Sequence, residues 1–330
     1  MPQISVILPV SNGEKTIQRA IKSILSQTFS DFELIVINNG STDKTNEILH
    51  QFSDKRIRRY NLPDKNLVNA LNHGISASNG KYIARMDADD ESMPHRLADQ
   101  LTFLDDHPEI GLVSGQVQYA GNKQRNQGYY AHVNWINTIT DHIQIYLSRF
   151  VESPLAHPSV MFRSDLIKKY GTYRDSDFPE DYELWLRWLH CGVKMGKVRQ
   201  TVIQWYDHDR RLSRTHAKYD PDRFHQLKAT YFLKWLGEKY TPSSYPDIFI
   251  WGRGSSVRRK SGYLIQAGLK ISGYIDLHPK QSSNAIYYKD LKKGQGLVLN
   301  YVSNRKGRLQ IHDYLIAHGF EEGVDFYMMN

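Results

Sequence analysis

The sequence has few of the features expected of secreted, membrane-spanning or zinc-binding proteins. Its 330 residues contain one cysteine, Cys191, which excludes an internal disulfide and a cysteine-based metal cluster. No stretch approaches the roughly 20 consecutive apolar residues that a membrane-spanning helix needs. The chain passes from Met1 almost directly into the apolar run at residues 4–8, with no basic segment before it, so we expect no secretion signal. We therefore expect a cytoplasmic protein.

Acidic residues are outnumbered by basic ones. The chain has 43 lysines and arginines against 35 aspartates and glutamates, a formal net charge of +8. This excess favours anionic partners, such as nucleotide diphosphates or an anionic lipid surface. We expect no nucleic-acid partner, because the sequence has neither zinc-finger spacing nor an aromatic RNA-binding motif. Scattered, solvated surface side chains would give the same net charge, and this alternative stays open.

Apolar runs and amphipathic segments alternate over the first hundred residues. Short apolar runs at 4–8, 32–37 and 82–86 predict buried strands, and helical spacing of apolar residues occurs between them. Further on, residues 138–150 predict a helix. The alternation predicts an α/β fold with a mostly parallel sheet that is flanked by helices on both faces. Ligands of such sheets bind beyond the carboxyl ends of the strands, where the polar clusters of this chain lie.

A turn-rich segment at residues 241–246 is the best domain boundary in the chain. We predict a large domain over 1–240 and a small one over 247–330. The small domain begins with a strand pattern that leads into the sequence Gly-Arg-Gly at 252–254.

The Gly-Arg-Gly segment resembles a shortened Rossmann fingerprint, although Val257 stands at the third glycine position. Asp276 follows about twenty residues later, where the second strand of such a unit would end. A small Rossmann-like α/β domain is therefore expected. This domain can bind a nucleotide, or it can form a homodimer interface. The glycines at 252 and 254 can also serve only tight packing, so the role of the domain stays open.

Three aspartates stand together at the end of the strand predicted over 82–86: Asp87, Asp89 and Asp90. Carboxylates this close repel one another unless a cation or hydrogen-bond donors compensate them. A hard divalent ion, Mn²⁺ or Mg²⁺, does so through one or two carboxylates together with substrate phosphates. An acidic turn that caps the following helix is the alternative.

Three motifs occur in a fixed order along the chain: SVILPVSNGE at residues 5–14, NGSTD at 39–43 and ARMDADD at 84–90. Together they strongly resemble the family 2 glycosyltransferases of the GT-A fold, over roughly the first two hundred residues. The resemblance implies an inverting, metal-dependent enzyme that moves a sugar from a nucleotide-diphosphate donor to a hydroxyl group. It favours a UDP-sugar donor and a glycan or lipid-linked acceptor in bacterial surface polysaccharide or lipopolysaccharide assembly.

The resemblance also assigns residues to the donor. Asp87 would contact the ribose or donor sugar, and Asp89 with Asp87 would hold the metal that bridges the diphosphate. The donor-binding set that it implies is Pro9, Val10, Asn12, Glu14, Asn39, Lys65, Arg85, Asp87 and Ala88. One departure concerns Asn39, which stands where relatives carry an aspartate that accepts from the pyrimidine N–H. The amide oxygen can still accept, but the amide also donates.

The sequence Pro-Glu-Asp-Tyr-Glu-Leu-Trp at 179–185 resembles the family's Glu-Asp motif. The resemblance implies that Asp181 deprotonates the acceptor hydroxyl and that Glu180 and His157 line the acceptor pocket. A helix N-cap is the alternative role of Asp181. Beyond this motif, the arginines at 210 and 214 lie in a loop that closes over the diphosphate in relatives. Arginine forks suit phosphate oxygens, so Arg210 and Arg214 are candidates for this contact.

Other functions stay open beside a transferase. A nucleotide-sugar-binding scaffold or sensor would lack turnover, but the presence of both Asp89 and Asp181 argues against it. A nucleotidyltransferase would need a Gly-rich loop with Arg or Lys after the first strand. A dehydrogenase would need a hydride-transfer site beside the Gly-Arg-Gly segment, and the sequence offers neither. Basic residues near the C-terminus allow a peripheral contact with the anionic inner face of the membrane.

Overall fold

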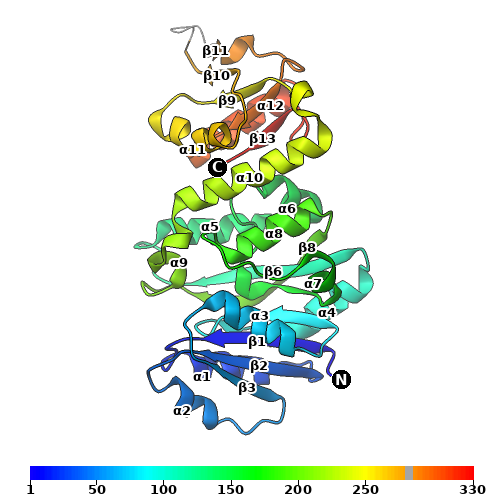
Figure 1. Cartoon of the computed structure of the whole chain (residues 1–330), viewed down its shortest axis with the longest axis vertical. Coiled ribbons are helices and arrows are strands. Elements are labelled where there is room, and N and C mark those ends of the chain that lie inside the picture. Colours follow the sequence, from blue (N-terminus) through cyan, green and yellow to red (C-terminus); the bar gives the residue numbers. More distant parts are fainter. Residues whose placement is uncertain (279–284) are drawn as a thin grey trace. The chain divides into compact units, whose positions relative to one another are not determined.

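The computed structural model describes residues 1–278 and 285–330, which form two compact units. The first unit comprises Met1–Ile145, Pro154–Ser176 and Glu180–Thr215, and the second comprises the remaining described residues. Each unit is built around its own sheet (Figure 1). The units are defined by compactness alone, so the domain boundaries at 240 and 247 stay predictions.

The sheet of the first unit has eight strands in the order β3-β2-β1-β4-β7-β6-β8-β5. These strands are β1 (Ile4–Val10), β2 (Phe32–Asn39), β3 (Ile57–Leu62), β4 (Tyr82–Arg85), β5 (Glu91–Ser92), β6 (Ile110–Ala120), β7 (Met161–Arg163) and β8 (Lys194–Tyr206). The strands β3, β2, β1 and β4 run parallel, β7 runs antiparallel to both β4 and β6, and β5 runs antiparallel to β8. The predicted α/β fold is confirmed, with a mixed sheet whose first half is parallel.

The helices of the first unit lie on both faces of this sheet (Figure 1). They are α1 (Ile17–Leu25), α2 (Thr45–His50), α3 (Leu67–Ala77), α4 (Arg96–Asp106), α5 (Gln127–Thr138), α7 (Asp165–Tyr170), α8 (Glu180–His190) and α9 (Leu212–Thr215), with α6 (His142–Ser148) extending from this unit into the second. The helix predicted over 138–150 is partly wrong. A break at residues 139–141 separates α5, which the sequence did not reveal, from α6.

Side chains alternate between the two faces of β1 and β2, as they do in any strand. Ile7 and Ile37 face α3, where a side-chain carbon added at Gly74 would lie 2.6 Å from Ile7 and 2.9 Å from Ile37. Val6 and Leu34 point to the opposite face and join a core that includes residues of α1. Because residue 74 is a glycine, α3 can approach the sheet closely and hold the carboxyl ends of β1 and β2 in place.

The second unit contains a five-stranded, fully parallel sheet in the order β11-β10-β9-β12-β13. Its strands are β9 (Ile248–Trp251), β10 (Gly273–Asp276), β11 (Ala285–Tyr287), β12 (Leu297–Asn300) and β13 (Phe326–Met328), and its helices are α10 (Pro221–Lys239), α11 (Ser255–Gln266) and α12 (Arg305–Ala317). The first strand lies in the centre and the chain continues to either side of it, as in doubly wound folds. A small Rossmann-like unit is therefore present.

Within residues 1–278 and 285–330, no helix combines the length and the apolar character that crossing a bilayer requires. The longest helix of these ranges is α10, with 19 residues. It carries charged side chains along its whole length: Asp222, Arg223, Lys228, Lys234, Glu238 and Lys239.

Candidate active site

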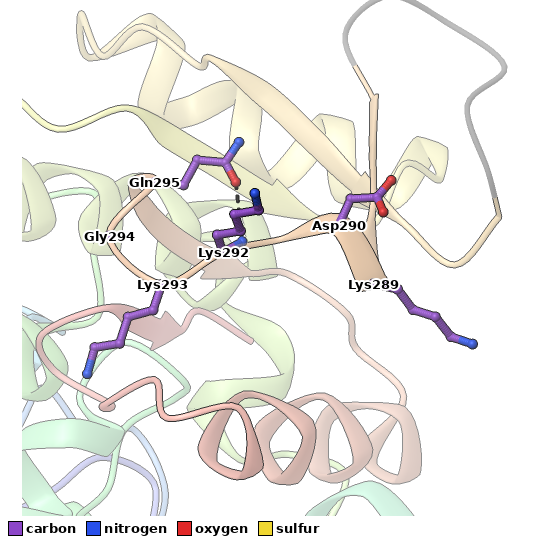
Figure 2. A pocket seen from close by; sticks show the side chains of 6 residues that line it. All are labelled: Lys289, Asp290, Lys292, Lys293, Gly294 and Gln295. Carbon is purple, nitrogen blue, oxygen red and sulfur yellow. Dashed lines mark hydrogen bonds between the residues drawn. The ribbon is translucent and has the colours of Figure 1, made fainter.

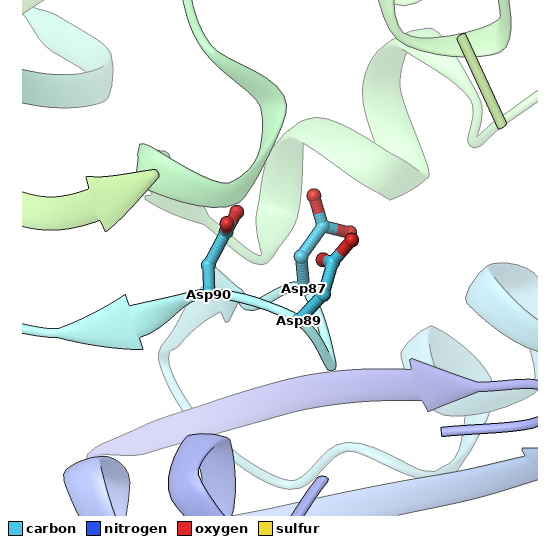
Figure 3. Close-up of side chains that lie close together, drawn as sticks. All are labelled: Asp87, Asp89 and Asp90. Carbon is cyan, nitrogen blue, oxygen red and sulfur yellow. The ribbon is translucent and has the colours of Figure 1, made fainter. Parts of the chain in front are cut away.

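The three aspartates lie just beyond the carboxyl end of β4, which is a central strand of the first sheet. Figure 3 shows the side chains of Asp87 and Asp89 next to each other, with Asp90 set further along the chain. One carboxylate oxygen from each residue lies within 4.8 Å of the other two. Hard divalent cations prefer such oxygen ligands, so the cluster has the composition and the spacing to hold one.

The side chain of Arg211 supplies positive charge to all three aspartates. Its Nη2 atom lies 3.3 Å from Asp87, and its Nη1 atom lies 3.3 Å from Asp90 and 3.8 Å from Asp89. Although burial acts to lower it, the charges of the three aspartates raise the pKa of Arg211 above its ordinary value. Because the side chain of Arg211 is only 8% exposed, water screens these ion pairs weakly.

Asp89 and Asp90 have different surroundings. Asp90 is fully buried, and although it accepts a 2.8 Å hydrogen bond from the backbone N–H of Tyr206, its Oδ2 atom has no hydrogen-bond partner among the described residues. Burial raises the pKa of Asp90 well above its ordinary value, against the opposing charge of Arg211. Asp89 lies 2.8 Å from Nε2 of His208. Burial acts to raise the pKa of Asp89, but Arg211 and His208 together lower it. Of these two carboxylates, Asp89 is therefore the one whose surroundings favour the charged form.

Two buried arginines lie behind the aspartates. Arg85, one of the predicted donor-binding residues, forms an ion pair with Asp87. Arg96 donates a 2.7 Å hydrogen bond to the backbone carbonyl of Arg85. Burial and the charge of Arg85 together lower the pKa of Arg96 to about 9, against the opposing charge of Asp90. The negative charge of the cluster is thus compensated by Arg85, at the end of β4, and by Arg211, in the loop after β8.

The predicted donor-binding residues Asn12 and Glu14 hold two loops together. The side chain of Asn12 accepts a 2.8 Å hydrogen bond from the backbone N–H of Thr42, and that of Glu14 accepts a 3.2 Å bond from the N–H of Lys44. Asn12 has a φ of 54°, a left-handed conformation that asparagine tolerates better than most residues. These contacts join the loop after Val10, at the end of β1, to the loop after β2.

Asn39, the last residue of β2, has an unused acceptor. Its side chain is buried, and its Oδ1 atom has no hydrogen-bond partner in the described part of the chain. The neighbouring Asn38, in contrast, donates to Asn61 at 3.0 Å. A buried acceptor without a donor is costly, and a ligand N–H can satisfy it. Lys65 lies close to Asn39, because its side chain borders the next residue, Gly40, which has a φ of 64°. The side chain of Lys65 is exposed to solvent.

The predicted acceptor-side residues gather at the start of α8. Asp181 is half-buried in the first turn, and its Oδ1 atom accepts a 2.8 Å hydrogen bond from the backbone N–H of Tyr182. Glu180 is buried, with its Oε1 atom 4.0 Å from Nδ1 of His157. The other ring nitrogen of His157 lies 2.7 Å from the hydroxyl oxygen of Tyr173. His157, Glu180 and Tyr173 therefore form one buried polar cluster.

Tyr173 links this cluster to the aspartates of β4. Its phenol is buried, and burial raises its pKa, while the charge of Arg85 acts in the opposite direction. The charges of Asp181, Glu180 and Asp87 raise the pKa of Tyr173 further. One phenol thus lies within electrostatic reach of both Asp87 and Asp181. This supports the predicted arrangement, in which the metal-binding carboxylates and the base share one site.

Reasoning from the sequence selected Arg210 and Arg214 as candidates and missed Arg211, which lies between them. Arg210 is exposed to solvent. Arg214 forms a 2.7 Å ion pair with Asp207, and its guanidinium lies over the ring of Tyr129. No sequence pattern distinguishes Arg211 from its neighbours, because side-chain directions in an irregular loop have no period.

A hollow in the second unit is formed by the segment that connects β11 to β12 in the sequence. It is lined by Lys289, Asp290, Lys292, Lys293, Gly294 and Gln295. Figure 2 shows its lysine side chains pointing in different directions, and Lys293 is held by the carbonyl of Gly319 at 2.7 Å and by Asp325 at 3.2 Å. Small-molecule sites have polar groups that converge on the ligand. The aspartate cluster of the first unit meets that description better.

Comparison with known proteins identifies relatives of this chain. A family model described as Glycosyl transferase family 2 matches residues 5–171. The O-antigen biosynthesis glycosyltransferase WbnJ of Escherichia coli is 31% identical over a region that covers 66% of this chain and 85% of WbnJ. The matched family region contains the three sequence motifs, the aspartate cluster and His157.

Two solved structures have a similar fold. Residues 1–349 of S. aureus TarS, in complex with UDP-GlcNAc, match with a TM-score of 0.56 at 19% identity over 70% of this chain. This chain spans 66% of that TarS fragment, slightly less than two thirds. The mannosyltransferase PcManGT from Pyrobaculum calidifontis, in complex with GDP-Man and Mn²⁺, matches with a TM-score of 0.50 at 15% identity, over 81% of this chain and 73% of PcManGT. At these identities the likeness establishes a shared fold.

Proposed function

Because the chain belongs to glycosyltransferase family 2, we propose that it transfers a sugar, with inversion, from a nucleoside-diphosphate donor to a hydroxyl group. The acceptor is a glycan or a lipid-linked glycan of bacterial surface polysaccharide assembly, the class of pathway that the name of WbnJ describes. The observation that carries the proposal is the position of Tyr173. Its hydroxyl oxygen lies 2.7 Å from Nε2 of His157, and the charges of both Asp87, in the aspartate cluster, and Asp181 raise the pKa of its phenol.

Asp87 and Asp89 would hold a divalent ion, Mn²⁺ or Mg²⁺. The residues fit such an ion, because three carboxylates offer oxygen atoms within 4.8 Å of one another, and one oxygen of Asp90 has no other partner in the described structure. The Mn²⁺ that accompanies GDP-Man in PcManGT supports this assignment. When bound, the ion stabilises the negative charge of the departing nucleoside diphosphate.

Asp181 would act as the general base. Its carboxylate takes the proton of the acceptor hydroxyl as that oxygen forms a bond to the anomeric carbon. The bond from this carbon to the donor phosphate breaks on the opposite face, and its electron pair leaves with the nucleoside diphosphate. Attack opposite to the leaving group inverts the anomeric configuration. The buried pair of Glu180 and His157 would position the acceptor next to Asp181.

The ends of β1 and β2 would bind the nucleoside. The Oδ1 atom of Asn39, which has no partner in the described part of the chain, would accept a hydrogen bond from the N–H of uracil, and we propose UDP as the nucleotide. The UDP-GlcNAc bound to TarS supports this choice. Lys65, exposed beside Gly40, would contact the base or a phosphate. Asn12 and Glu14 serve the same pocket indirectly, because their side chains hold its two loops together.

The decisive experiment measures transfer from a panel of nucleotide sugars in the presence of Mn²⁺, with the anomeric configuration of the product determined by NMR. We expect an inverted product, and a rate that falls about 10²–10⁴-fold in Asp181→Asn, since a positioned general base contributes this much. Asp165→Asn is the matched control, because Asp165 is an exposed aspartate in the first turn of α7. A retained configuration, or full activity of Asp181→Asn, would contradict the mechanism.

A scaffold or sensor would behave differently in the same assay. It would be stabilised against heat by a nucleotide sugar with Mn²⁺, by an amount set by the ligand concentration and affinity, yet it would release no nucleoside diphosphate. Measuring thermal stability and turnover on one protein sample separates the two functions.

A further inference from the structure

The guanidinium of Arg211 occupies the position that a cation needs in the aspartate cluster. Its two terminal nitrogens reach Asp87 and Asp90 at 3.3 Å and Asp89 at 3.8 Å. These are the same three residues whose oxygens can converge on one metal ion. From this overlap we propose that Arg211 is an internal counter-cation that an incoming metal ion displaces. The inference rests on the function proposed above.

The charges of the cluster explain why both cations cannot stay. Arg85 pairs with Asp87, and Arg211 lies beside all three carboxylates. A divalent ion held by Asp87 and Asp89 would take oxygens that face the guanidinium of Arg211. Two cations that share the same carboxylates repel strongly in a site with little water. Arg211 therefore has to leave the oxygens that the ion takes.

The segment that carries Arg211 can make this movement locally. Arg211 precedes the short helix α9, and the residues before it, Asp209 and Arg210, are exposed. Inside the cluster the side chain is held by the three aspartates, by a 2.7 Å hydrogen bond to the carbonyl of Tyr206, and by the ring of Trp205, which lies 4.6 Å from the guanidinium carbon. The incoming diphosphate offers new oxygen acceptors close by, and a guanidinium fork binds these well. Arg211 is thus a positioning residue that exchanges carboxylate partners for phosphate partners.

The exchange predicts opposite effects of one substitution on two ligands. In Arg211→Gln, Mn²⁺ alone should bind at least about tenfold more tightly than in the wild-type chain, because its competitor is gone. UDP in the presence of saturating Mn²⁺ should bind about tenfold more weakly, because a charged phosphate contact is lost. Isothermal titration calorimetry on the full chain measures both affinities. Arg125→Gln is the control. It removes an exposed arginine that pairs with Asp209 on the same loop, and it should change neither affinity.

An unchanged or weaker affinity for Mn²⁺ in Arg211→Gln would overturn the proposal. Wild-type protein that binds no nucleotide sugar with Mn²⁺ would overturn the proposed function instead, so the two failures are distinguishable.

A second measurement needs no arginine variant. Displacement of Arg211 from the ring of Trp205 should change the fluorescence of this tryptophan when Mg²⁺ is added to the wild-type chain. The change should vanish in Trp205→Phe. If Mg²⁺ binds and the fluorescence of Trp205 does not change, Arg211 stays in place and the exchange does not occur.

Discussion

The two units of this chain place aspartates at equivalent ends of parallel strands, with different results. Beyond β4, Asp87, Asp89 and Asp90 crowd together, and burial raises the pKa of Asp90 well above its ordinary value. Beyond β10, Asp276 forms a 3.0 Å ion pair with Arg253, the arginine of the Gly-Arg-Gly loop. Although burial acts to raise it, hydrogen bonds from the backbone of His278 and from Arg253 lower the pKa of Asp276.

The difference shows that sheet topology alone does not make a reactive site. Both strand ends have the geometry where ligands of α/β sheets bind. At β10 the single carboxylate of Asp276 pairs with Arg253 and accepts a hydrogen bond from the backbone N–H of His278. At β4 three carboxylates lie within 4.8 Å of one another, and one oxygen of Asp90 has no partner among the described residues. Function in such folds depends on the residues at the strand ends, and the first unit carries the crowded set of acids.

The sharpest test of this comparison removes one charge from each strand end. Asp89→Asn should slow sugar transfer about 10²–10³-fold or more, because it weakens the cation site that stabilises the leaving group. Asp276→Asn should leave transfer within about twofold of the wild-type rate, because it weakens a partly exposed ion pair in the second unit. Steady-state rates of the two variants with one donor measure both effects. A comparable loss in Asp276→Asn would show that the second unit takes part in the reaction.

A second pair of variants concerns buried lysines, one in each unit. Burial lowers the pKa of Lys197 and of Lys228 to about 7, well below the ordinary value of 10.5. The folded chain therefore binds fewer protons than the unfolded chain between about pH 7 and 10.5, so the free energy of unfolding rises with pH in that window and is lowest below it. Lys197→Met should raise the free energy of unfolding at pH 7 by about 2 kcal/mol. The upper limit for this gain, set by the size of the pKa shift, is ~5 kcal/mol.

Lys228→Met should stabilise less. Lys228 donates to two carbonyls, those of Val151 and Met329, whereas Lys197 donates to one, that of Ile136. The charge of Glu152 acts to raise the pKa of Lys228, whereas burial is the sole cause of the shift in Lys197. Urea unfolding at pH 7 and pH 10 measures both differences. A pH dependence that is the same in wild type and in Lys197→Met would refute the assignment.

The smallest expected effect comes from a pair of helix caps. Asn66 accepts a 3.1 Å hydrogen bond from the backbone N–H of Asn69 at the start of α3, and Asn304 accepts a 3.0 Å bond from that of Gly307 at the start of α12. Replacing either cap with alanine should cost about 1 kcal/mol. Asn66→Ala should cost more, because Asn66 also donates to Asp175 at 2.8 Å. Equal losses in chemical denaturation would show that this second bond contributes nothing.

The sequence predicts those parts of the fold that depend on local pattern. The strands β1 and β2 are contiguous apolar runs, and the aspartates after β4 are neighbours in the chain, so both are visible without coordinates. Helix α5 was missed because its beginning, Gln-Gly-Tyr-Tyr-Ala-His, includes a glycine and lacks a strong apolar period. The predicted helix over 138–150 ran across the break that follows α5.

The rest of the site depends on contacts between distant segments. Arg211 meets aspartates that precede it by more than 120 residues, and Tyr173 meets His157 from a loop without regular structure. Asn12 was predicted as a donor contact, but its side chain bridges two loops instead of standing free. Sequence reasoning thus finds the acids that need compensation, and only the tertiary structure shows which cation compensates them.

The amide at the end of β2 has a consequence for base selection. An ionised carboxylate in the position of Asn39 could only accept a hydrogen bond from a donor on a ligand. A half-turn about the terminal bond of an asparagine exchanges its oxygen and nitrogen, and with them the roles of acceptor and donor. The side chain of Asn39 can therefore pair with either a donor or an acceptor, without any change in its backbone.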